Sequence, residues 1–358
     1  MTPRVSLRPD LSALTGYHSP QVPAEVRLNT NESPLPPPDG WRKELEAAVG
    51  RMEFHRYPDR HARALRSGLA ELHEVGEDEI FCANGSNEVL QCLFLAFGGA
   101  GRRALVFEPT YALHRHIAGI TATEVVAGCR TEDFRIEPGE ADRLLTERQP
   151  DLTLLCSPNN PTGRVEPNEV VRQIVASAPG LVVVDEAYGQ FAHCSALALR
   201  GDPAVDAAAL AVVRTFSKTW AMAASRLGYL VAEPEVVAGC DAVALPYHLS
   251  GPTQAAGVLA LRYREEMEQR VSLVAGERGR LAAALATMPV ATWPSEASFV
   301  LFRPLRRPAA QVWQELLARG VLIRDCSTWE GLTGCLRVTV GTPEENDRFL
   351  EAMSGVLG

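Results

Sequence analysis

Residues 209–220 read ALAVVRTFSKTW, a run of apolar residues followed by a polar segment that carries Lys218. The apolar run predicts a buried strand that ends where the threonine and serine begin. A lysine just beyond a buried strand is poorly solvated, so we expect its pKa to be lowered. A lysine that can lose its proton is a nucleophile able to form a Schiff base. Taken alone, the segment fits a solvated loop lysine better, because most lysines are exposed.

Short apolar runs alternate with amphipathic segments on both sides of Lys218. This alternation predicts an α/β fold, a three-layer sandwich built on a mostly parallel, doubly wound sheet. In such sheets ligands bind at the carboxyl ends of the strands. The expected strands span residues 80–83, 103–107, 124–127, 152–156, 181–185, 209–213 and 227–232. One expected helix ends at residue 97, and further helices span residues 111–118, 141–147, 168–177 and 233–245.

The chain is predicted to divide into three parts. Residues 1–40 are rich in proline and form an arm that contributes to the small domain and to dimer contacts. Residues 41–250 form the large domain, and residues 251–358 form a linking helix and a smaller α+β C-terminal domain. Outside the elements given above, apolar spacing predicts helices at residues 41–52, 60–73, 254–286, 309–319 and 343–356 and strands at residues 298–302, 321–324 and 336–340.

Composition disfavours several classes of protein. The 358 residues are 46% hydrophobic and 22% charged with a net charge of −9, which is typical of a soluble protein and argues against a nucleic-acid or anionic-membrane partner. The N-terminus lacks an apolar stretch long enough for a signal peptide, and no run approaches the length of a membrane span. The eight cysteines are scattered without a CxxC pair. We therefore expect a cytoplasmic protein with reduced thiols and no metal site.

Polar groups follow three other expected strands. Asp185 closes an apolar run, and its carboxylate is costly to bury without a positive partner, although a cap or an ion pair would also explain it. Residues 85–87, GSN, open a helix whose N–H groups could bind an anion or form an ordinary N-cap. Residues 157–163, SPNNPTG, form a stiff turn whose amides could bind a ligand or none. Together with Lys218, these groups suit pyridoxal phosphate, an aldehyde cofactor with a phosphate group.

A series of motifs resembles those of the fold-type I pyridoxal-phosphate aminotransferases of classes I and II. The resemblance is closest to the histidinol-phosphate aminotransferase branch and covers nearly the whole chain. It is highly specific for the cofactor and much less so for the substrate. The motifs are LNTNESP at residues 28–34, HRYPD at 55–59, GSNE at 85–88, EPTY at 108–111, NNPTG at 159–163, DEAY at 185–188, TFSK at 215–218 with RLGY at 226–229, and LRVTVGT at 336–342.

The resemblance implies a role for each matching residue around the cofactor ring. Lys218 would carry the cofactor as an internal aldimine and then move the proton between substrate and cofactor. Asp185 would pair with the ring nitrogen and keep it protonated. Asn160 and Tyr188 would donate hydrogen bonds to the ring oxygen, and Tyr111 would stack on the ring.

The resemblance also implies a phosphate site and a dimer. Tyr57 matches a tyrosine that reaches the phosphate bound by the partner subunit, so the active sites would be shared within a homodimer. An arginine in the phosphate site supplies both charge and a forked set of donors. The phosphate would be held by Ser86, Asn87, Thr215, Ser217 and Arg226.

The substrate pocket is implied in the same way. Arg337 matches the arginine that clamps the substrate carboxylate, Arg324 and Tyr17 would be further anion contacts, and Asn31 would also bind substrate. In this branch one pocket accepts both the phosphate of one substrate and the carboxylate of glutamate. The resulting expectation is a ping-pong transamination between histidinol phosphate and 2-oxoglutarate, a step of histidine biosynthesis.

Three departures from the branch leave the substrate open. Residues 220–225, WAMAAS, replace an FGLAG run and could reshape the cofactor edge. Ser298 replaces an asparagine. Residues 326–330, CSTWE, add bulk near the expected substrate pocket. An aromatic amino acid aminotransferase and an enzyme similar to threonine-phosphate decarboxylase are alternatives within the fold. A non-catalytic pyridoxal-phosphate-binding regulator is an alternative of another class, although such regulators usually carry a basic DNA-binding domain that this acidic chain lacks.

Overall fold

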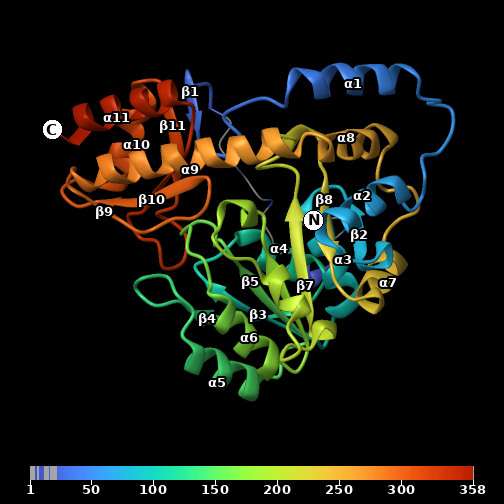
Figure 1. Cartoon of the computed structure of the whole chain (residues 1–358). Helices are drawn as coiled ribbons and strands as arrows, with labels where there is room; N and C mark the ends of the chain where they lie inside the picture. The colour runs from blue at the N-terminus through green and yellow to red at the C-terminus, as the bar shows by residue number, and fades with distance from the viewer. Residues whose placement is uncertain (1–4, 6–7, 12–15, 17–21, 358) are drawn as a thin grey trace.

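A large sheet forms the centre of the computed structural model, which describes residues 5, 8–11, 16 and 22–357 (Figure 1). Its strand order is β2-β8-β7-β6-β5-β3-β4, and β3 to β7 pair in parallel whereas β8 is antiparallel to both of its neighbours. Every strand predicted for this sheet is present. The strands are β2 (Ile80–Ala83), β3 (Arg103–Glu108), β4 (Glu124–Cys129), β5 (Leu152–Cys156), β6 (Leu181–Asp185), β7 (Leu210–Thr215) and β8 (Gly228–Val231).

Helices cover both faces of the large sheet, which confirms the predicted three-layer sandwich. Side chains alternate between the faces of a strand. In β6, Val183 packs in the cluster that includes α3, α4 and α7, whereas Val182 and Val184 pack in the cluster that includes α5 and α6. The helices are α2 (Arg63–His73), α3 (Ser86–Phe97), α4 (Ala112–Ile120), α5 (Pro138–Arg148), α6 (Asn168–Ser177) and α7 (Pro234–Val243).

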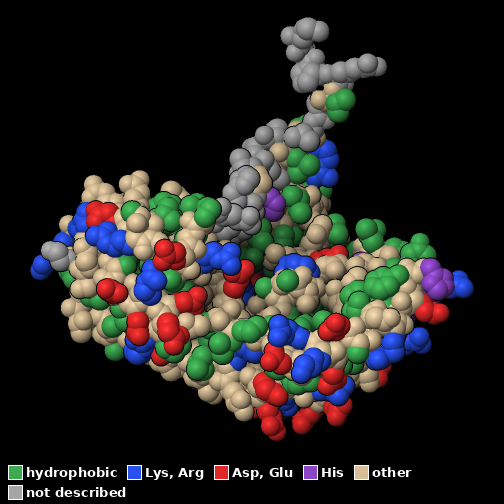
Figure 2. Space-filling model, turned by 90° about the horizontal axis from the view of Figure 1, so that it is seen from above, with side chains coloured by type: hydrophobic (Ala, Val, Ile, Leu, Met, Phe, Trp, Pro, Cys, Tyr) green, Lys and Arg blue, Asp and Glu red, His purple; other side chains and the backbone are tan. Residues whose placement is uncertain are grey.

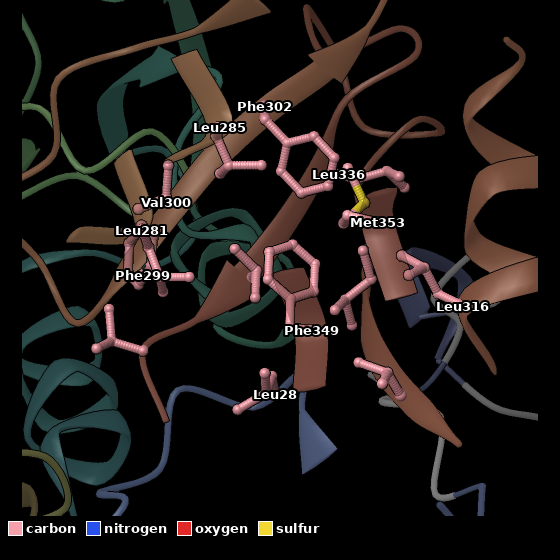
Figure 3. Packing of buried hydrophobic residues seen from close by; sticks show 14 of the residues in the cluster. Leu28, Leu281, Leu285, Phe299, Val300, Phe302, Leu316, Leu336, Phe349 and Met353 are labelled. Atoms are coloured by element: carbon pink, nitrogen blue, oxygen red, sulfur yellow. The ribbon is translucent and has the colours of Figure 1, made fainter. Parts of the chain in front are cut away.

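A second sheet, with strand order β1-β11-β12-β10-β9, forms the smaller part of the molecule. Its buried residues pack against α9, α10 and α11, and Figure 3 shows the rings of Phe302 and Phe349 close to each other in this cluster, with 6.2 Å between their centroids. The sequence did not predict β1 and β9, each of three residues. The elements are β1 (Val26–Leu28), β9 (Val290–Thr292), β10 (Phe299–Pro304), α10 (Ala309–Ala318), β11 (Val321–Asp325), β12 (Leu336–Thr339) and α11 (Pro343–Leu357).

The long helix predicted for residues 254–286 is wrong as a single element. The structure has two helices, α8 (Gly251–Leu261) and α9 (Arg264–Ala286), which lie end to end across the top of the molecule in Figure 1. Tyr263 lies between them with non-helical backbone angles, and its hydroxyl donates to Glu44 Oε1 of α1 (Asp39–Gly50) at 2.8 Å. A tertiary contact thus accompanies a break that apolar spacing does not reveal.

The surface carries charges of both signs. On the face shown in Figure 2, lysine and arginine side chains are interspersed with acidic ones. Among the described residues, no helix combines the length and the apolar character that crossing a membrane would require.

Candidate active site

The carboxyl ends of β5, β6 and β7 meet at one edge of the large sheet, because these strands pair in parallel with Cys156 opposite Asp185 and Asp185 opposite Val213. A cavity of about 310 Å³ opens at this edge, a volume within the range of about 300 to 1,000 Å³ found for small-molecule sites. The residues in its wall that the sequence predicts are Asn31, Ser86, Asn87, Tyr111, Asn160, Asp185, Tyr188, Thr215, Ser217, Lys218, Arg226, Arg324 and Arg337.

Lys218 lies in the cavity wall, three residues beyond the end of β7. Its Nζ donates hydrogen bonds to the carbonyl oxygens of Asn31, at 2.8 Å, and of Thr30, at 3.3 Å. Burial lowers the pKa of this lysine to about 8, and the positive charge of Arg337 lowers the pKa further whereas Glu32 opposes the shift. The lowered pKa agrees with the expectation from the sequence, and a pKa of about 8 leaves about a tenth of Lys218 unprotonated at pH 7.

Asp185 is buried at the end of β6 beside a histidine that the sequence analysis missed. The carboxylate accepts from the backbone N–H of Ala187, at 3.1 Å, and lies 3.1 Å from Nε2 of His114. Because an ionised carboxylate only accepts, His114 is the donor, and its Nδ1 has no partner among the described residues. The only sequence signal is its position three residues after Tyr111, whose ring meets the His114 ring edge-on.

A hydrogen-bonded network lines the opposite wall. Asn31 donates from Nδ2 to the Tyr188 hydroxyl at 2.8 Å, and burial raises the pKa of that tyrosine. Arg337 donates from Nη1 to Oδ1 of Asn160 and from Nη2 to the carbonyl oxygen of Asn29 at 2.9 Å. Since Oδ1 of Asn160 is engaged by an arginine, its N–H₂ group is the part of the amide suited to donate to a ligand.

The turn from β2 into α3 forms an anion cup. Gly85 has φ +83°, and a Cβ at this position would lie 2.6 Å from Nη2 of Arg226. Because Gly85 has no Cβ, the guanidinium lies close to the N-terminus of α3, where backbone N–H groups and the positive end of the helix dipole favour an anion. Arg226 donates from Nη1 to Ser217 Oγ at 3.4 Å, and Thr215 Oγ1 donates to the same oxygen at 3.0 Å. Tyr111 donates to Asn87 Oδ1 at 3.2 Å.

Two arginines face each other across neighbouring strands of the small sheet. Arg324 of β11 is the register partner of Arg337 of β12, and both line the cavity although their side chains are almost buried, at 8% and 4% exposed. Like charges directly opposite each other destabilise a sheet. Each guanidinium lies over an aromatic ring, Arg324 at 5.3 Å from Trp329 and Arg337 at 5.1 Å from Phe299. Two positive charges therefore lie close together in this wall of the cavity.

Tyr57 and Trp220, both singled out in the sequence, do not line this cavity. Tyr57 is 80% exposed and stacks on Tyr247 with 4.5 Å between ring centroids, so this chain does not bring it to its own cavity. Tyr17 lies outside the described residues. The expectation that Trp220 could reshape the cofactor edge is not supported, because its ring is buried against Phe216 in a core cluster and does not line the cavity.

The chain belongs to the aminotransferase class I and II family, which matches residues 23–353. It is a transaminase of this pyridoxal-phosphate-dependent family. A histidinol-phosphate aminotransferase of Frankia casuarinae is 45% identical over 98% of this chain and 90% of that protein, and one of Corynebacterium glutamicum is 42% identical over 98% and 96%.

Solved structures share the fold. Histidinol-phosphate aminotransferase from Sinorhizobium meliloti, in complex with pyridoxal-5′-phosphate, gives a TM-score of 0.88 at 21% identity over 99% of this chain and 98% of that chain. L-Threonine-O-3-phosphate decarboxylase from Porphyromonas gingivalis gives 0.79 at 23% identity over 93% and 99%. At these identities the likeness concerns the fold alone.

Proposed function

We propose that this enzyme transfers the amino group of histidinol phosphate to 2-oxoglutarate, with pyridoxal phosphate bound at Lys218. The observation that carries the proposal is the pair of almost buried arginines, Arg324 and Arg337, opposite each other in one cavity wall. The phosphate dianion of histidinol phosphate satisfies two such charges better than the uncharged side chain of an aromatic amino acid would. The names of the relatives from Frankia and Corynebacterium support the same substrate.

The described residues fit the cofactor at each of its polar groups. The space left by the missing side chain of Gly85, together with Arg226 and the N-terminus of α3, suits the phosphate. The carboxylate of Asp185 suits a protonated ring nitrogen, and the lowered pKa of Lys218 suits attack on the aldehyde. When bound, pyridoxal phosphate supplies an electron sink for the carbon that loses its proton.

Each of the side chains around the cofactor then has a separate role. With the cofactor bound, Lys218 would hold the proton at Nζ and would return it to the substrate carbon or to the cofactor. The carboxylate of Asp185, held by His114 and the Ala187 N–H, keeps a negative charge beside the ring nitrogen. The N–H₂ group of Asn160 and the hydroxyl of Tyr188 would donate to the ring oxygen of the bound cofactor.

The cavity must also accept glutamate in the second half of the reaction. Arg337 is oriented by Asn160 and Asn29 and suits a carboxylate or a phosphate oxygen, because a guanidinium binds either in a bidentate way. Arg324 adds the second charge that a phosphate needs. Asn31 lies between Lys218 and Tyr188 in the hydrogen-bonded network and lines the cavity, so it would contact the substrate from there.

We also infer a homodimer with shared active sites, located in the cytoplasm. Phe54, Tyr57, Leu245 and Tyr247 are large apolar or aromatic side chains that are exposed in the single chain. Such a group is typical of an interface between subunits, and Tyr57 would reach the partner's cofactor phosphate from there. All eight cysteines are free, which is consistent with a reducing compartment.

A substrate panel tests the proposed activity. Purified enzyme with pyridoxal phosphate is assayed with histidinol phosphate, phenylalanine and threonine phosphate, each with 2-oxoglutarate, and release of carbon dioxide is followed in parallel. We expect kcat/KM for histidinol phosphate to exceed that for phenylalanine by at least about 100-fold, because phenylalanine lacks the phosphate that the two buried charges favour by several kcal/mol. Threonine phosphate shares the phosphate, so it is distinguished by whether transamination or release of carbon dioxide is observed. Absence of turnover with histidinol phosphate, alongside transamination of phenylalanine or decarboxylation of threonine phosphate, would overturn the proposal. A visible cofactor band that no amino donor shifts would instead indicate a binding protein without catalysis.

A further inference from the structure

The active-site cavity has two carboxylates in the part of its wall that the structure describes, Asp185 and Glu32. Asp185 is 1% exposed and already accepts hydrogen bonds from the Ala187 N–H and from His114. Glu32 is exposed, and its carboxylate makes no hydrogen bond or ion pair with another described residue. An ionised carboxylate only accepts hydrogen bonds. Glu32 is therefore the acidic group of this wall that is available to a donor on the substrate.

A short segment of the arm places Glu32 relative to the other groups of the site. The carbonyl oxygen of Asn29 accepts from Nη2 of Arg337 at 2.9 Å. The carbonyl oxygen of Asn31 accepts from Nζ of Lys218 at 2.8 Å. Glu32 follows directly, after a left-handed backbone conformation at Asn31 with a φ of 55°. The segment thus lies, in chain order, against an arginine that suits an anion and then against the reacting amine, and it ends in a carboxylate.

The carboxylate of Glu32 is close enough to Lys218 to act on its charge. Burial lowers the pKa of Lys218 to about 8, the positive charges of Arg337 and Arg226 also lower it, and the negative charge of Glu32 raises it. Glu32 and Lys218 also line a second, small cavity together. A substrate group bound by Glu32 therefore lies beside the carbon that exchanges its proton with Lys218.

We propose that Glu32 is a substrate-binding residue that accepts a hydrogen bond from the imidazole N–H of histidinol phosphate and thereby sets the preference for an amine with a nitrogen heterocycle. This inference rests on the proposed function. In histidinol phosphate, the carbon that bears the amine has the phosphate on one side and the imidazole on the other. With the phosphate at the paired arginines and the amine at Lys218, the ring lies on the remaining side, where Glu32 supplies an acceptor. Phenylalanine has no donor on its ring and threonine phosphate has no ring, so this contact distinguishes histidinol phosphate from both.

Two variants of Glu32 test the contact with the imidazole. Glu32→Gln keeps the shape of the side chain and a neutral acceptor, whereas Glu32→Ala removes the acceptor. We expect KM for histidinol phosphate to rise about fivefold in the glutamine variant and at least about tenfold in the alanine variant, because hydrogen bonds to an ionised acceptor are roughly twice as strong as neutral ones. In both variants kcat should stay within about threefold of wild type.

Two compounds without the ring show whether the effect belongs to the imidazole. KM for glutamate should not rise in either variant, because glutamate has no N–H group other than the amine that reacts. Ethanolamine phosphate, a phosphorylated amine without a ring, is used as a competitive inhibitor. Its inhibition constant should be the same in wild type and in both variants, because it engages the arginines and leaves Glu32 without a partner.

A further measurement on Glu32→Gln needs no amino substrate. Pyridoxal phosphate should attach covalently to the cofactor-free variant about two to three times faster than to wild type at pH 7. The reason is that loss of the negative charge lowers the pKa of Lys218 and increases its neutral fraction. Glu25→Gln is the matched control, since Glu25 lies in the same arm and is exposed, but it pairs with Arg348 at 2.7 Å and does not line the cavity. This control should leave the attachment rate and both KM values unchanged.

The outcomes that would overturn the inference are specific. They are an unchanged KM for histidinol phosphate in both Glu32 variants, an equal rise of the inhibition constant for ethanolamine phosphate, an unchanged attachment rate in Glu32→Gln, and the same changes in Glu25→Gln. A change of molecular mass of Glu32→Gln in light scattering would also overturn it, because the carboxylate would then belong to a subunit interface. Failure of the proposed function is distinguished because it appears in wild-type enzyme, as absence of turnover with histidinol phosphate.

Discussion

The surroundings of Lys218 hold its amine in a fixed position and also make it more nucleophilic by lowering its pKa. The carbonyl oxygens of Asn31 and Thr30 hold Nζ in place, while burial and the charge of Arg337 favour the neutral amine. A lysine in water has a pKa of about 10.4 and is almost wholly protonated at neutral pH. The lowered pKa is therefore a property of the folded cavity and leads to a pH dependence that can be measured.

The rate at which pyridoxal phosphate attaches covalently to the cofactor-free enzyme should follow the neutral form of Lys218. With a pKa of about 8, protonated below and neutral above, the rate should rise about tenfold between pH 7 and pH 9 and level off beyond. Visible absorbance in stopped-flow mixing measures it. Lys218→Ala, the control, should bind the cofactor only non-covalently and turn over no substrate. A rate that still rises steeply above pH 9.5 would show that the amine titrates as an ordinary lysine.

At the scale of elements, the turn from β2 to α3 shows how backbone geometry prepares an anion site. Gly85 adopts a positive φ, and Arg226, two residues before the start of β8, also has a positive φ of 51°. The missing Cβ of Gly85 is what lets the Arg226 guanidinium lie against the start of α3. Two unusual backbone conformations thus place one side chain, and their cost is offset by the stability of the surrounding sheet.

Gly85→Ala should weaken cofactor retention, because its Cβ would overlap Nη2 of Arg226. We expect the dissociation constant for pyridoxal phosphate to rise by at least about tenfold, since a charged hydrogen-bonding contact contributes about 1.5 to 3 kcal/mol. Equilibrium dialysis or absorbance titration measures it.

Gly99→Ala is the matched control for this substitution. Gly99 also has a positive φ, of 109°, but no atom lies within 4 Å of the position its Cβ would take. Because both glycines have a positive φ, each substitution should lower the free energy of unfolding by about 1 kcal/mol, which thermal unfolding measures. Equal cofactor affinity in the two variants would contradict the proposed role of the Gly85 turn.

At the scale of the whole molecule, two sheets that differ in strand order meet at the cavity. The large sheet supplies Asp185 and Lys218, and the small sheet supplies Arg324 and Arg337. The exposed Tyr57 belongs to neither wall, although its motif implies a cofactor contact. The proposed second subunit would resolve this difference, since a tyrosine on the surface of one chain can complete the site of another.

Mixed dimers test the shared site. Tyr57→Ala and Lys218→Ala should each be nearly inactive, and unfolding, mixing and refolding should restore activity. Random pairing makes about half of the molecules mixed dimers, each with one intact site, so about a quarter of wild-type activity per subunit is expected. No recovery, with dimers present by light scattering, would count against a shared site.

Much of the fold was predictable because it follows from local patterns. Buried parallel strands such as residues 181–185 and 210–215 consist of apolar runs that end in polar residues, and this pattern is visible without any tertiary contact. The short strand β1 was missed because three residues carry no period, and its pairing with β11 joins residues almost 300 positions apart. The break at Tyr263 was missed because the tyrosine is bonded to a helix distant in sequence.

The sequence by itself determined the cofactor chemistry, since the lysine, the carboxylate, the anion cup and the arginines appear in it as spaced motifs. Only the tertiary structure decided how these groups act on one another. His114 behind Asp185 and Trp329 on Arg324 are such contacts. The physical reason is that pKa values and side-chain orientation depend on burial and on neighbours within a few ångströms, which chain folding brings together from separate elements.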